Sequence, residues 1–412
     1  MFNLKIIKTY HFLRIIQVVI KFIPFLFIPN VLSIDDYASY SLITAVVTLS
    51  LFFLGLEIWY LYNRNINANL TSLGNSDVIN EQLSNYLFSY LLFIPCILLY
   101  VNTINLHNGL LIIGICCFTH ACQEFSRILI HLKALNYSAI ISVVQASWVL
   151  VLPFGVVNDL FELLFFIFIF SVIPFFISCY FLFKLGVVIN LKKIFSFNFN
   201  VFFSTIKEIK MLFLGAVFIK LGVFFPRFLL DYLDSNSFLA VLSFYQSLAL
   251  VQEFFIYTLI QSKYVPILLG ESDKSKKITV RKKYFKYNCI SIVFLLVTGS
   301  IGSILFAYVF LDNPIYFKLY PLAIICFTSN AILCFSNYYA SLLYCEKLDW
   351  SHKYSGIVCL IGTIIIMLLI LPFGVEFVYL AVMFLLVFSL LLLFFRFYLW
   401  NRVSVFNCGV GL

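Results

Sequence analysis

The sequence predicts an all-α membrane protein with about twelve transmembrane helices, and three observations lead to this class. Hydrophobic residues make up 63% of the 412 residues and charged residues only 11%, whereas a soluble domain is roughly half apolar and about a quarter charged. Apolar runs of about 20 residues, the length that crosses a bilayer, fill most of the chain. Asn, Asp, Lys and Gly gather in the breaks between the runs. A soluble globular fold is therefore excluded.

Run length places the spans better than hydropathy does, because fifty phenylalanines raise the hydropathy without adding spans. The first run resembles a signal peptide, but Arg14, Gln17 and Lys21 interrupt it and no small-residue cleavage site follows. We therefore expect it to remain as the first span. The twelve spans lie near residues 11–32, 38–61, 84–102, 109–131, 138–157, 161–185, 208–230, 237–262, 287–311, 315–343, 354–372 and 376–399.

Lys and Arg fall almost entirely on one side of these spans. With a cytoplasmic N-terminus, about 22 of them, Arg396 and Arg402 included, lie in inside segments, and only Arg227 and Lys318 lie outside. The positive-inside rule then predicts that both termini are cytoplasmic. The net charge of +9 comes from these short loops, so a nucleic-acid partner is rejected. The eleven cysteines lie mostly in apolar runs without CxxC pairs, which predicts small core residues rather than disulfides or metal ligands.

The polar segment between the sixth and seventh spans divides the chain into halves. We expect an N-terminal six-helix lobe (1–186), a cytoplasmic or interfacial linker (187–206), a C-terminal six-helix lobe (207–400) and a cytoplasmic tail (401–412). A shift of about 202 residues superposes Phe22 on Phe224 and Pro24 on Pro226. So few identities are close to chance in this composition. A repeat-built transporter and a coincidence therefore stay equally open.

Six spans carry polar or charged side chains at helical spacing, so that each set shares one face of its helix. A charge that faces lipid costs at least about 2.5 kcal/mol, so these faces should point into the bundle. Two interpretations stay open: interhelical hydrogen bonds and ion pairs such as Glu124 with Arg127, or the lining of a central cavity. Lys21 and Lys220 favour the cavity, because neither has an acid three or four residues away. The stripes are Arg14–Gln17–Lys21, Ser50–Glu57–Arg64, His120–Glu124–Arg127–His131, Lys220–Arg227, Gln246–Glu253–Tyr257–Gln261 and Asn330–Asn337.

The sign of this cavity points to an anionic ligand. The candidate cations Arg14, Lys21, Arg127, Lys220 and Arg227 outnumber the candidate anions Glu57, Glu124 and Glu253, and a cation facing phosphate binds strongly in low dielectric. Glu253 or Glu124 is able to couple transport to protons, although Arg127 would keep Glu124 ionised. The sequence has no G-x-x-x-x-G-K-[ST] loop, no soluble domain, no long external loop with paired carboxylates and no metal-spaced His cluster. We expect no enzyme activity, cofactor or metal.

Three segments resemble the polysaccharide exporters and lipid-linked oligosaccharide (O-antigen) flippases of the multidrug/oligosaccharidyl-lipid/polysaccharide (MOP) superfamily. FIPFLFIPNVLSIDDYASYSLITAVVTLSLFFLGLEIWYLYNR (22–64) has the first-helix proline, the short acidic loop, a Tyr-x-x-Tyr-like start to the second helix and Leu-Gly-Leu before a charged end. FFPRFLLDYLDSNSFLAVLSFYQSLALVQEFFIYTLIQSKYVPIL (224–268) has the helix-7 arginine as Arg227, and HLKALNYSAIISVVQASWVLVLP (131–153) resembles the helix 4–5 connection. The family's Gly-x-Tyr is Ala38-Ser39-Tyr40 here, and its Asp-Arg is Pro226-Arg227.

The resemblance implies two six-helix lobes around a V-shaped cavity in a bacterial inner membrane. It implies alternating access and transfer of an undecaprenyl-pyrophosphate-linked oligosaccharide (an O-antigen or capsule repeat unit) to the periplasmic leaflet. We expect this transfer to be coupled to an ion, H+ or Na+. Arg14, Lys21, Lys220 and Arg227 would hold the pyrophosphate; Gln17, Glu57, Glu124, Arg127, Gln246, Glu253, Tyr257, Asn330 and Asn337 would line the cavity or couple ions.

The protein partners implied are a polysaccharide polymerase and glycosyltransferases. Two alternatives stay open. A multidrug antiporter of the same superfamily would favour an acidic cavity. An O-antigen polymerase would need a large outward loop.

Overall fold

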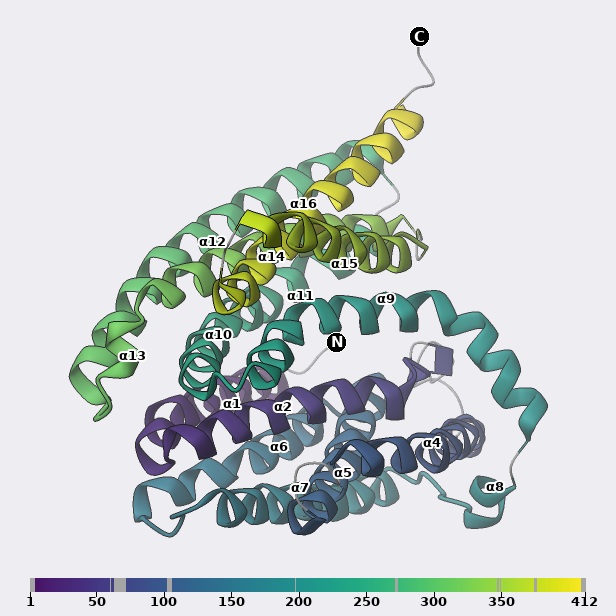
Figure 1. Cartoon of the computed structure of the whole chain (residues 1–412). Helices are drawn as coiled ribbons and strands as arrows, with labels where there is room; N and C mark the ends of the chain where they lie inside the picture. The colour runs from purple at the N-terminus through teal and green to yellow at the C-terminus, as the bar shows by residue number, and fades with distance from the viewer. Residues whose placement is uncertain are drawn as a thin grey trace. The chain divides into compact units, whose positions relative to one another are not determined.

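A computed structural model of the chain is helical throughout, and no strand occurs in the residues that it describes: 4–59, 61–62, 72–101, 106–196, 198–270, 273–346, 348, 350–373 and 376–408 (Figure 1). The elements are α1 (Leu4–Val31), α2 (Ile34–Gly55), α4 (Ser72–Val101), α5 (Leu106–His131), α6 (Leu135–Ala146), η1 (Ser147–Phe154), α7 (Leu160–Lys184), α8 (Leu191–Phe195), α9 (Phe199–Tyr232), α10 (Asn236–Ile256), η2 (Tyr257–Gln261), α11 (Ser262–Gly270), α12 (Lys274–Phe310), α13 (Ile315–Lys318), α14 (Pro321–Cys345), α15 (Trp350–Ile370), η3 (Leu371–Phe373) and α16 (Phe377–Cys408).

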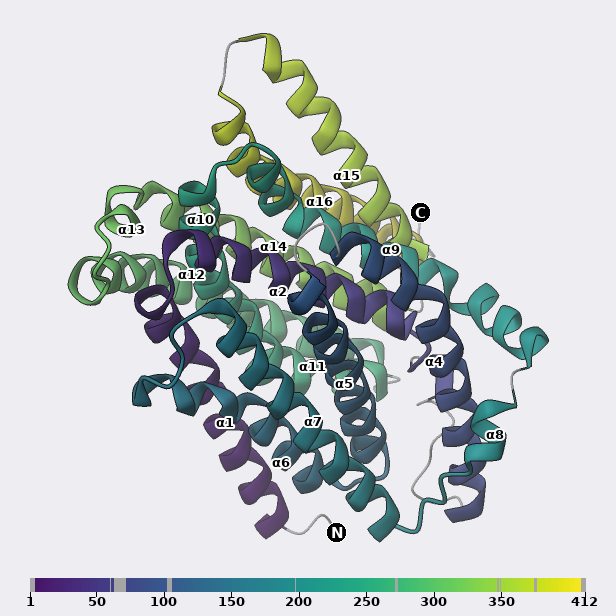
Figure 2. The same ribbon diagram turned by 60° about the horizontal axis from the view of Figure 1, so that its bottom comes forward.

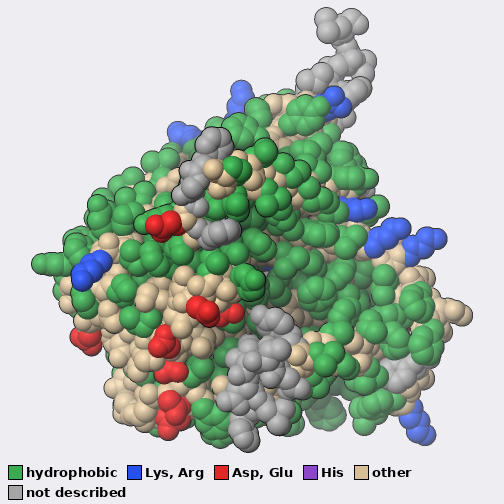
Figure 3. All heavy atoms as spheres, viewed as in Figure 1, with side chains coloured by type: hydrophobic (Ala, Val, Ile, Leu, Met, Phe, Trp, Pro, Cys, Tyr) green, Lys and Arg blue, Asp and Glu red, His purple; other side chains and the backbone are tan. Residues whose placement is uncertain are grey.

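The helices have the length and composition of membrane spans. Eleven helices in the described ranges are long and apolar enough to cross a bilayer, and α1 adds a further helix of 28 residues. Hydrophobic side chains cover most of the face seen in Figure 3, as expected of a surface in contact with lipid. The predicted class, an all-α multi-pass membrane protein with about twelve spans, is confirmed.

The chain forms two compact units, residues 1–213 and 214–412, and the boundary falls inside α9. In the first unit, α5 packs against α2, α4, α6 and α7, and α1 packs against α6. Phe202 and Ile209 at the start of α9 are buried in the same cluster as Tyr62 and Tyr86. The first part of α9 therefore belongs to the core of the first unit.

The segment that we expected to link the two lobes is held against α4. Asn80 Nδ2 donates to the carbonyl oxygen of Val188 at 2.9 Å, and the backbone N–H of Asn190 donates to Asn80 Oδ1 at 2.9 Å. Ser76 Oγ accepts from the backbone N–H of Val188 at 3.0 Å. Beyond Asn190 comes the short α8, which lies beside α4 at one end of the unit in both ribbon views, and then α9, whose first turns contact α4 through Phe199 and Phe202 (Figures 1 and 2).

In the second unit, α14 packs against α10, α12 and α16, and α15 packs against α16. Two glycines of α9 allow this helix to pack closely against α15 and α16. A Cβ atom on Gly215 would lie 2.6 Å from the backbone carbon of His352 in α15, and one on Gly222 would collide with the ring of the buried Phe388 in α16. The core of the unit closes around this second contact, and its buried members include Val223, Leu360, Phe384 and Leu392.

The helix that begins as α10 changes its winding at residue 257. Residues Tyr257–Gln261 form a π-turn, and the α-helix resumes as α11 at Ser262. A π-turn holds more residues than an α-turn, so side chains after it fall on a different face. The predicted stripe from Gln246 through Tyr257 is interrupted here, and the Tyr257 side chain is 61% exposed.

Candidate functional site

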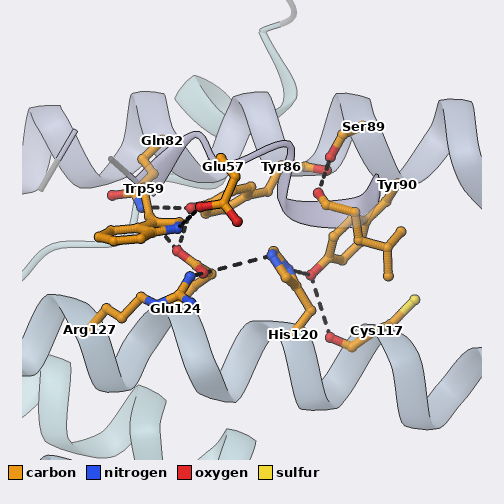
Figure 4. Close-up of polar contacts among 11 residues, drawn as sticks. Glu57, Trp59, Gln82, Tyr86, Ser89, Tyr90, Cys117, His120, Glu124 and Arg127 are labelled. Carbon is orange, nitrogen blue, oxygen red and sulfur yellow. Dashed lines mark hydrogen bonds and ion pairs between the residues drawn. The ribbon is translucent and has the colours of Figure 1, made fainter. Parts of the chain in front are cut away.

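Each unit contains a buried polar cluster. We call the one in the first unit the Glu124 cluster; it brings together the end of α2, the middle of α4 and α5 (Figure 4). Its members are Glu57, Trp59, Gln82, Tyr86, Tyr90, His120, Glu124 and Arg127.

Glu124 lies at the centre of this cluster and is 1% exposed. Its carboxylate accepts hydrogen bonds from the Tyr86 hydroxyl on one oxygen and from Arg127 Nη1 on the other. Gln82 Nε2 lies 3.5 Å from the first oxygen. A buried carboxylate is stable only when such donors replace water, and α4 and α5 supply them. The ion pair that the spacing of Glu124 and Arg127 predicts within one helix is present.

His120 sits one turn before Glu124 on α5 and is enclosed by aromatic rings. Its Nδ1 lies 2.6 Å from the Tyr90 hydroxyl, and its Nε2 lies 3.8 Å from the Glu124 carboxylate. The rings of Tyr86 and Tyr90 pack edge-on against the imidazole, at centroid distances of 4.9 and 5.5 Å. A Cβ atom on Gly55 would lie 2.6 Å from Nε2. The last residue of α2 must therefore be glycine for His120 to occupy this place.

Glu57 and Trp59 form the open edge of the cluster. After α2 ends, Leu56 and Glu57 adopt left-handed conformations with φ of 47° and 58°, which are uncommon outside glycine. Trp59 Nε1 donates to Glu57 Oε2 at 2.6 Å, and the Arg127 guanidinium lies 4.5 Å from the indole centroid. The Arg127 side chain is 37% exposed. It thus joins the buried carboxylate of Glu124 to the rim that carries Glu57.

We call the polar cluster of the second unit the Arg396 cluster; its members are Gln252, Glu253, Asn330, Ser336, Asn337 and Arg396. Arg396 on α16 is 3% exposed, and its Nη1 donates to Asn337 Oδ1 at 2.9 Å and to Ser336 Oγ at 3.1 Å. Asn337 Nδ2 in turn donates to Glu253 Oε1 at 3.1 Å. A neutral amide therefore stands between the guanidinium and the carboxylate.

The same cluster continues two turns along α14. Asn330 Nδ2 donates to the carbonyl oxygen of Ala249 at 2.6 Å and to Gln252 Oε1 at 3.1 Å. The two predicted asparagines of this helix, Asn330 and Asn337, thus contact α10 together, as interhelical amides do in membrane bundles.

Arg227 forms a separate buried contact between α9 and α10. Its side chain is 2% exposed, and its Nε donates to Gln246 Oε1 at 2.8 Å. Gln246 Nε2 donates to the carbonyl oxygen of Val223 at 2.8 Å. The guanidinium lies 5.3 Å from the Phe224 ring. Gln246 fixes the guanidinium by accepting from it while donating to the helix that carries it.

The predicted pyrophosphate residues are distributed as follows. Arg14 and Lys21 belong to α1, but their side chains lie outside the described part of the structure. Lys220 is half-buried on α9 and forms no ion pair with a described residue. Arg227 is engaged by Gln246. Gln17 is buried on α1.

Sequence reasoning missed two kinds of residue. The charge pattern counts Arg396 with the cytoplasmic segments but does not predict its burial within α16; its spacing of seven from Ser389 is the signal that marks an inward face. The third span predicted at 84–102 excludes Gln82, whereas the helix is apolar enough to span from near Ser76. The spacing of four and three between Gln82, Tyr86 and Ser89 would have revealed their shared face.

Comparison with known proteins places this geometry in a known architecture. No protein-family model matches the sequence, and no curated protein matches it. Among solved structures, a proline-to-alanine mutant of a MATE protein superposes with a TM-score of 0.67 at 13% identity over 97% of this chain and 94% of that chain. An outward-facing multidrug resistance MATE family transporter of the MOP superfamily gives 0.62 at 14% identity over 95% and 98%.

The chain has the MATE fold. A third structure with this fold, from Pyrococcus furiosus, gives a TM-score of 0.50 at 12% identity over 97% of this chain and 93% of that chain. It is described as a MOP superfamily transporter in which reverse polarity of the binding pocket suggests a different function. At these identities the likeness shows the fold, which is consistent with the superfamily that the sequence resembles.

Proposed function

We propose that this chain is an ion-coupled exporter of a bacterial cytoplasmic membrane. The observation that carries the proposal is the likeness of at least 95% of the chain to transporters with the MATE fold at TM-scores above 0.6. In this proposal the lobes 1–186 and 207–400, joined by the linker 187–206, enclose a central cavity and expose it alternately to the two sides of the membrane. Both termini are cytoplasmic.

The Glu124 cluster is the coupling site of this proposal, with H+ as the ion. An ionisable residue inside a membrane is a functional candidate by default, and Glu124 is a fully buried carboxylate with His120 beside it. A proton on Glu124 would cancel the charge that holds Arg127. The Arg127 guanidinium would then be free to move toward Glu57. Both residues already contact the Trp59 side chain: Glu57 accepts from the indole N–H, and the guanidinium lies over the indole ring. Proton binding is thereby converted into a movement of α5 side chains.

Two substrate classes fit this transporter, and different observations favour them. A multidrug antiporter is favoured by the structural neighbour that is described as a multidrug resistance transporter. The flippase hypothesis rests on the sequence resemblance and on charge. Among the described residues, the buried charged side chains are Glu124, Arg227 and Arg396, so the balance is positive and suits an anionic head group. The multidrug interpretation is the better supported, because a transporter with the same fold is described as a multidrug resistance protein.

One pair of assays separates the classes. The first measures resistance and dye efflux for cationic drugs in a bacterial host that lacks its own efflux pumps. The second measures transbilayer movement of a fluorescent polyprenyl-pyrophosphate oligosaccharide in proteoliposomes. Efflux of the dye without lipid movement would establish the antiporter, and the reverse would establish the flippase. Failure of both assays in correctly inserted protein would overturn the proposed function.

Coupling is tested in the same vesicles with an imposed pH gradient. Glu124→Gln should keep the shape of the side chain but abolish the dependence of transport on the gradient. Glu208→Gln, a matched change at an exposed acid of α9, should leave it intact. Gradient-driven transport at the normal rate by Glu124→Gln would remove Glu124 from the coupling site.

A further inference from the structure

The helix α12 is much longer than a membrane requires. Its 37 residues extend about 55 Å at 1.5 Å per residue, whereas the hydrocarbon core of a bilayer is about 30 Å thick. Residues 287–310 contain no charged side chain, and residues 274–286 contain seven Lys and Arg. The apolar stretch therefore fills the hydrocarbon core, and the basic turns stand at the level of the lipid head groups.

One face of the basic turns is fixed to the protein. Lys277 Nζ lies 2.9 Å from Glu346 Oε1 at the end of α14, and Arg281 Nη2 donates to the same oxygen. The Arg281 guanidinium also lies 4.9 Å from the Trp400 ring centroid. Tyr284, one turn further, is 1% exposed. These contacts set the rotation of α12 about its axis and so decide which lysines point outward.

The opposite face presents lysines in line with lipid-facing apolar side chains. Lys276, Lys283 and Lys286 are exposed. Their spacing of seven and three continues into an exposed row on the same side of the helix: Tyr287, Ile290, Phe294 and Val297, each between 51% and 63% exposed. In this helix only 11% of the most apolar 18 residues are buried, compared with 61% in α14. The row below the lysines therefore faces acyl chains.

The three lysines have little to neutralise them within the protein. Lys283 and Lys286 form no ion pair with a described residue, and Lys276 Nζ lies 4.0 Å from the exposed carboxylate of Asp273. Cations at the membrane surface attract anionic lipid by about 1 kcal/mol each, which corresponds to roughly fivefold in affinity per lysine. The positive charge of the three lysines fits an anionic head group, and the continuous apolar row below them fits acyl chains. Both features therefore match a ligand that has an anionic head group and acyl chains.

We propose that this face of α12 binds an anionic phospholipid. The lysines at 276, 283 and 286 contact the head-group phosphate, and the acyl chains lie along Ile290 and Phe294. The site is independent of the transported substrate, because it lies on the outer face of one unit and uses no residue of the Glu124 or Arg396 clusters.

The test is a titration of the full-length protein in detergent with phosphatidylglycerol, followed by native mass spectrometry of the lipid adducts. Wild-type protein should bind its first phosphatidylglycerol at least tenfold more tightly than phosphatidylcholine. The triple variant K276Q/K283Q/K286Q should lose at least tenfold in that affinity, and K276R/K283R/K286R should keep it. Because the lysines are exposed, these variants should fold normally.

The matched control removes the same charge elsewhere. K192Q/K207Q/K210Q changes three exposed lysines of α8 and α9 and should leave the first adduct unchanged. An equal loss in both triple variants would show general attraction by net charge and overturn the site. Unchanged affinity in K276Q/K283Q/K286Q would overturn it as well.

Discussion

The Glu124 and Arg396 clusters are built around charges of opposite sign. In the first unit the centre is a carboxylate that pairs directly with a guanidinium on the same helix, with an imidazole 3.8 Å away. In the second unit the centre is a guanidinium whose nearest partners are an amide and a hydroxyl, with Glu253 reached only through Asn337. The buried charge of the first unit is therefore stabilised by an opposite charge, and that of the second unit by neutral hydrogen-bonding groups.

This difference assigns different capacities to the two clusters. A carboxylate can take up a proton, so the charge of the Glu124 cluster can change during a transport cycle. In the Arg396 cluster the guanidinium remains charged under all physiological conditions, and the carboxylate of Glu253 is separated from it by Asn337. We therefore infer that protonation breaks an ion pair directly only in the first unit, whereas protonation of Glu253 would leave the contacts of Arg396 in place.

The largest expected effect is that of Glu124→Ala. It leaves Arg127 and the Tyr86 hydroxyl without their acceptor, and breaking a buried pair costs about 3–5 kcal/mol. We expect the lower end of that range, about 3 kcal/mol, because Arg127 is 37% exposed. The measurement is the free energy of unfolding in mixed detergent micelles. Glu253→Ala, which removes only an amide contact, should lose much less, and equal losses would contradict the contrast between the two units.

The next effect in size is that of Gly55→Ala. The new methyl group would lie 2.6 Å from His120 Nε2, and the rings of Tyr86 and Tyr90 prevent the imidazole from moving aside. We expect a loss of about 2 kcal/mol from overpacking, together with slower proton-driven transport. In Gly222→Ala the new methyl group would collide with the Phe388 ring in the second unit. This control should lose a similar amount of stability while leaving the coupling of transport to protons unchanged. Identical transport defects would show that His120 has no special role.

A smaller effect is expected for Arg396→Leu. It removes two interhelical hydrogen bonds, which contribute on average about 0.6 kcal/mol each in membrane proteins, and it also removes a buried charge. The unfolding free energy should fall by about 1 kcal/mol. A loss as large as that of Glu124→Ala would mean that Glu253 and Arg396 act as a direct ion pair.

The smallest effect is expected for Trp59→Phe. The variant keeps an aromatic face under Arg127 but loses the indole N–H that donates to Glu57. We expect a loss of about 1 kcal/mol or less in the free energy of unfolding and normal proton coupling at saturating substrate. Complete loss of coupling would show that Trp59 is required for the proton-dependent step and does not merely support Glu57 and Arg127.

The sequence was sufficient for the fold class and for contacts within one helix. Run length and composition identify the spans, because crossing a bilayer requires long apolar helices whatever their arrangement. The pair Glu124 and Arg127 could be predicted because both residues lie on one helix at a fixed spacing. The helical stripe that contains Asn330 and Asn337 likewise points inward, toward α10.

Contacts between helices could not be derived in this way. The partner of Arg227 is Gln246 on the next helix, and the partner of Arg396 is Asn337, 59 positions away. Helical spacing says which face a residue occupies but not which neighbour covers that face. The burial of Arg396 could not be predicted for a related reason: near the end of an apolar run, a cation that reaches the head groups and a cation buried in the bundle look alike.

The π-turn at Tyr257–Gln261 has a mechanical consequence for the helix that contains it. Such a turn stores one surplus residue, and tightening it to a regular turn rotates everything beyond it by about 100°, the angle that one residue occupies in an α-helix. Such a rotation would also have to break the packing of Tyr264 and Leu268, which are buried against residues of α12 and α14. The stretch from Ser262 to Gly270 can therefore take a second rotational setting only together with a rearrangement of the α12 and α14 side chains that pack against it.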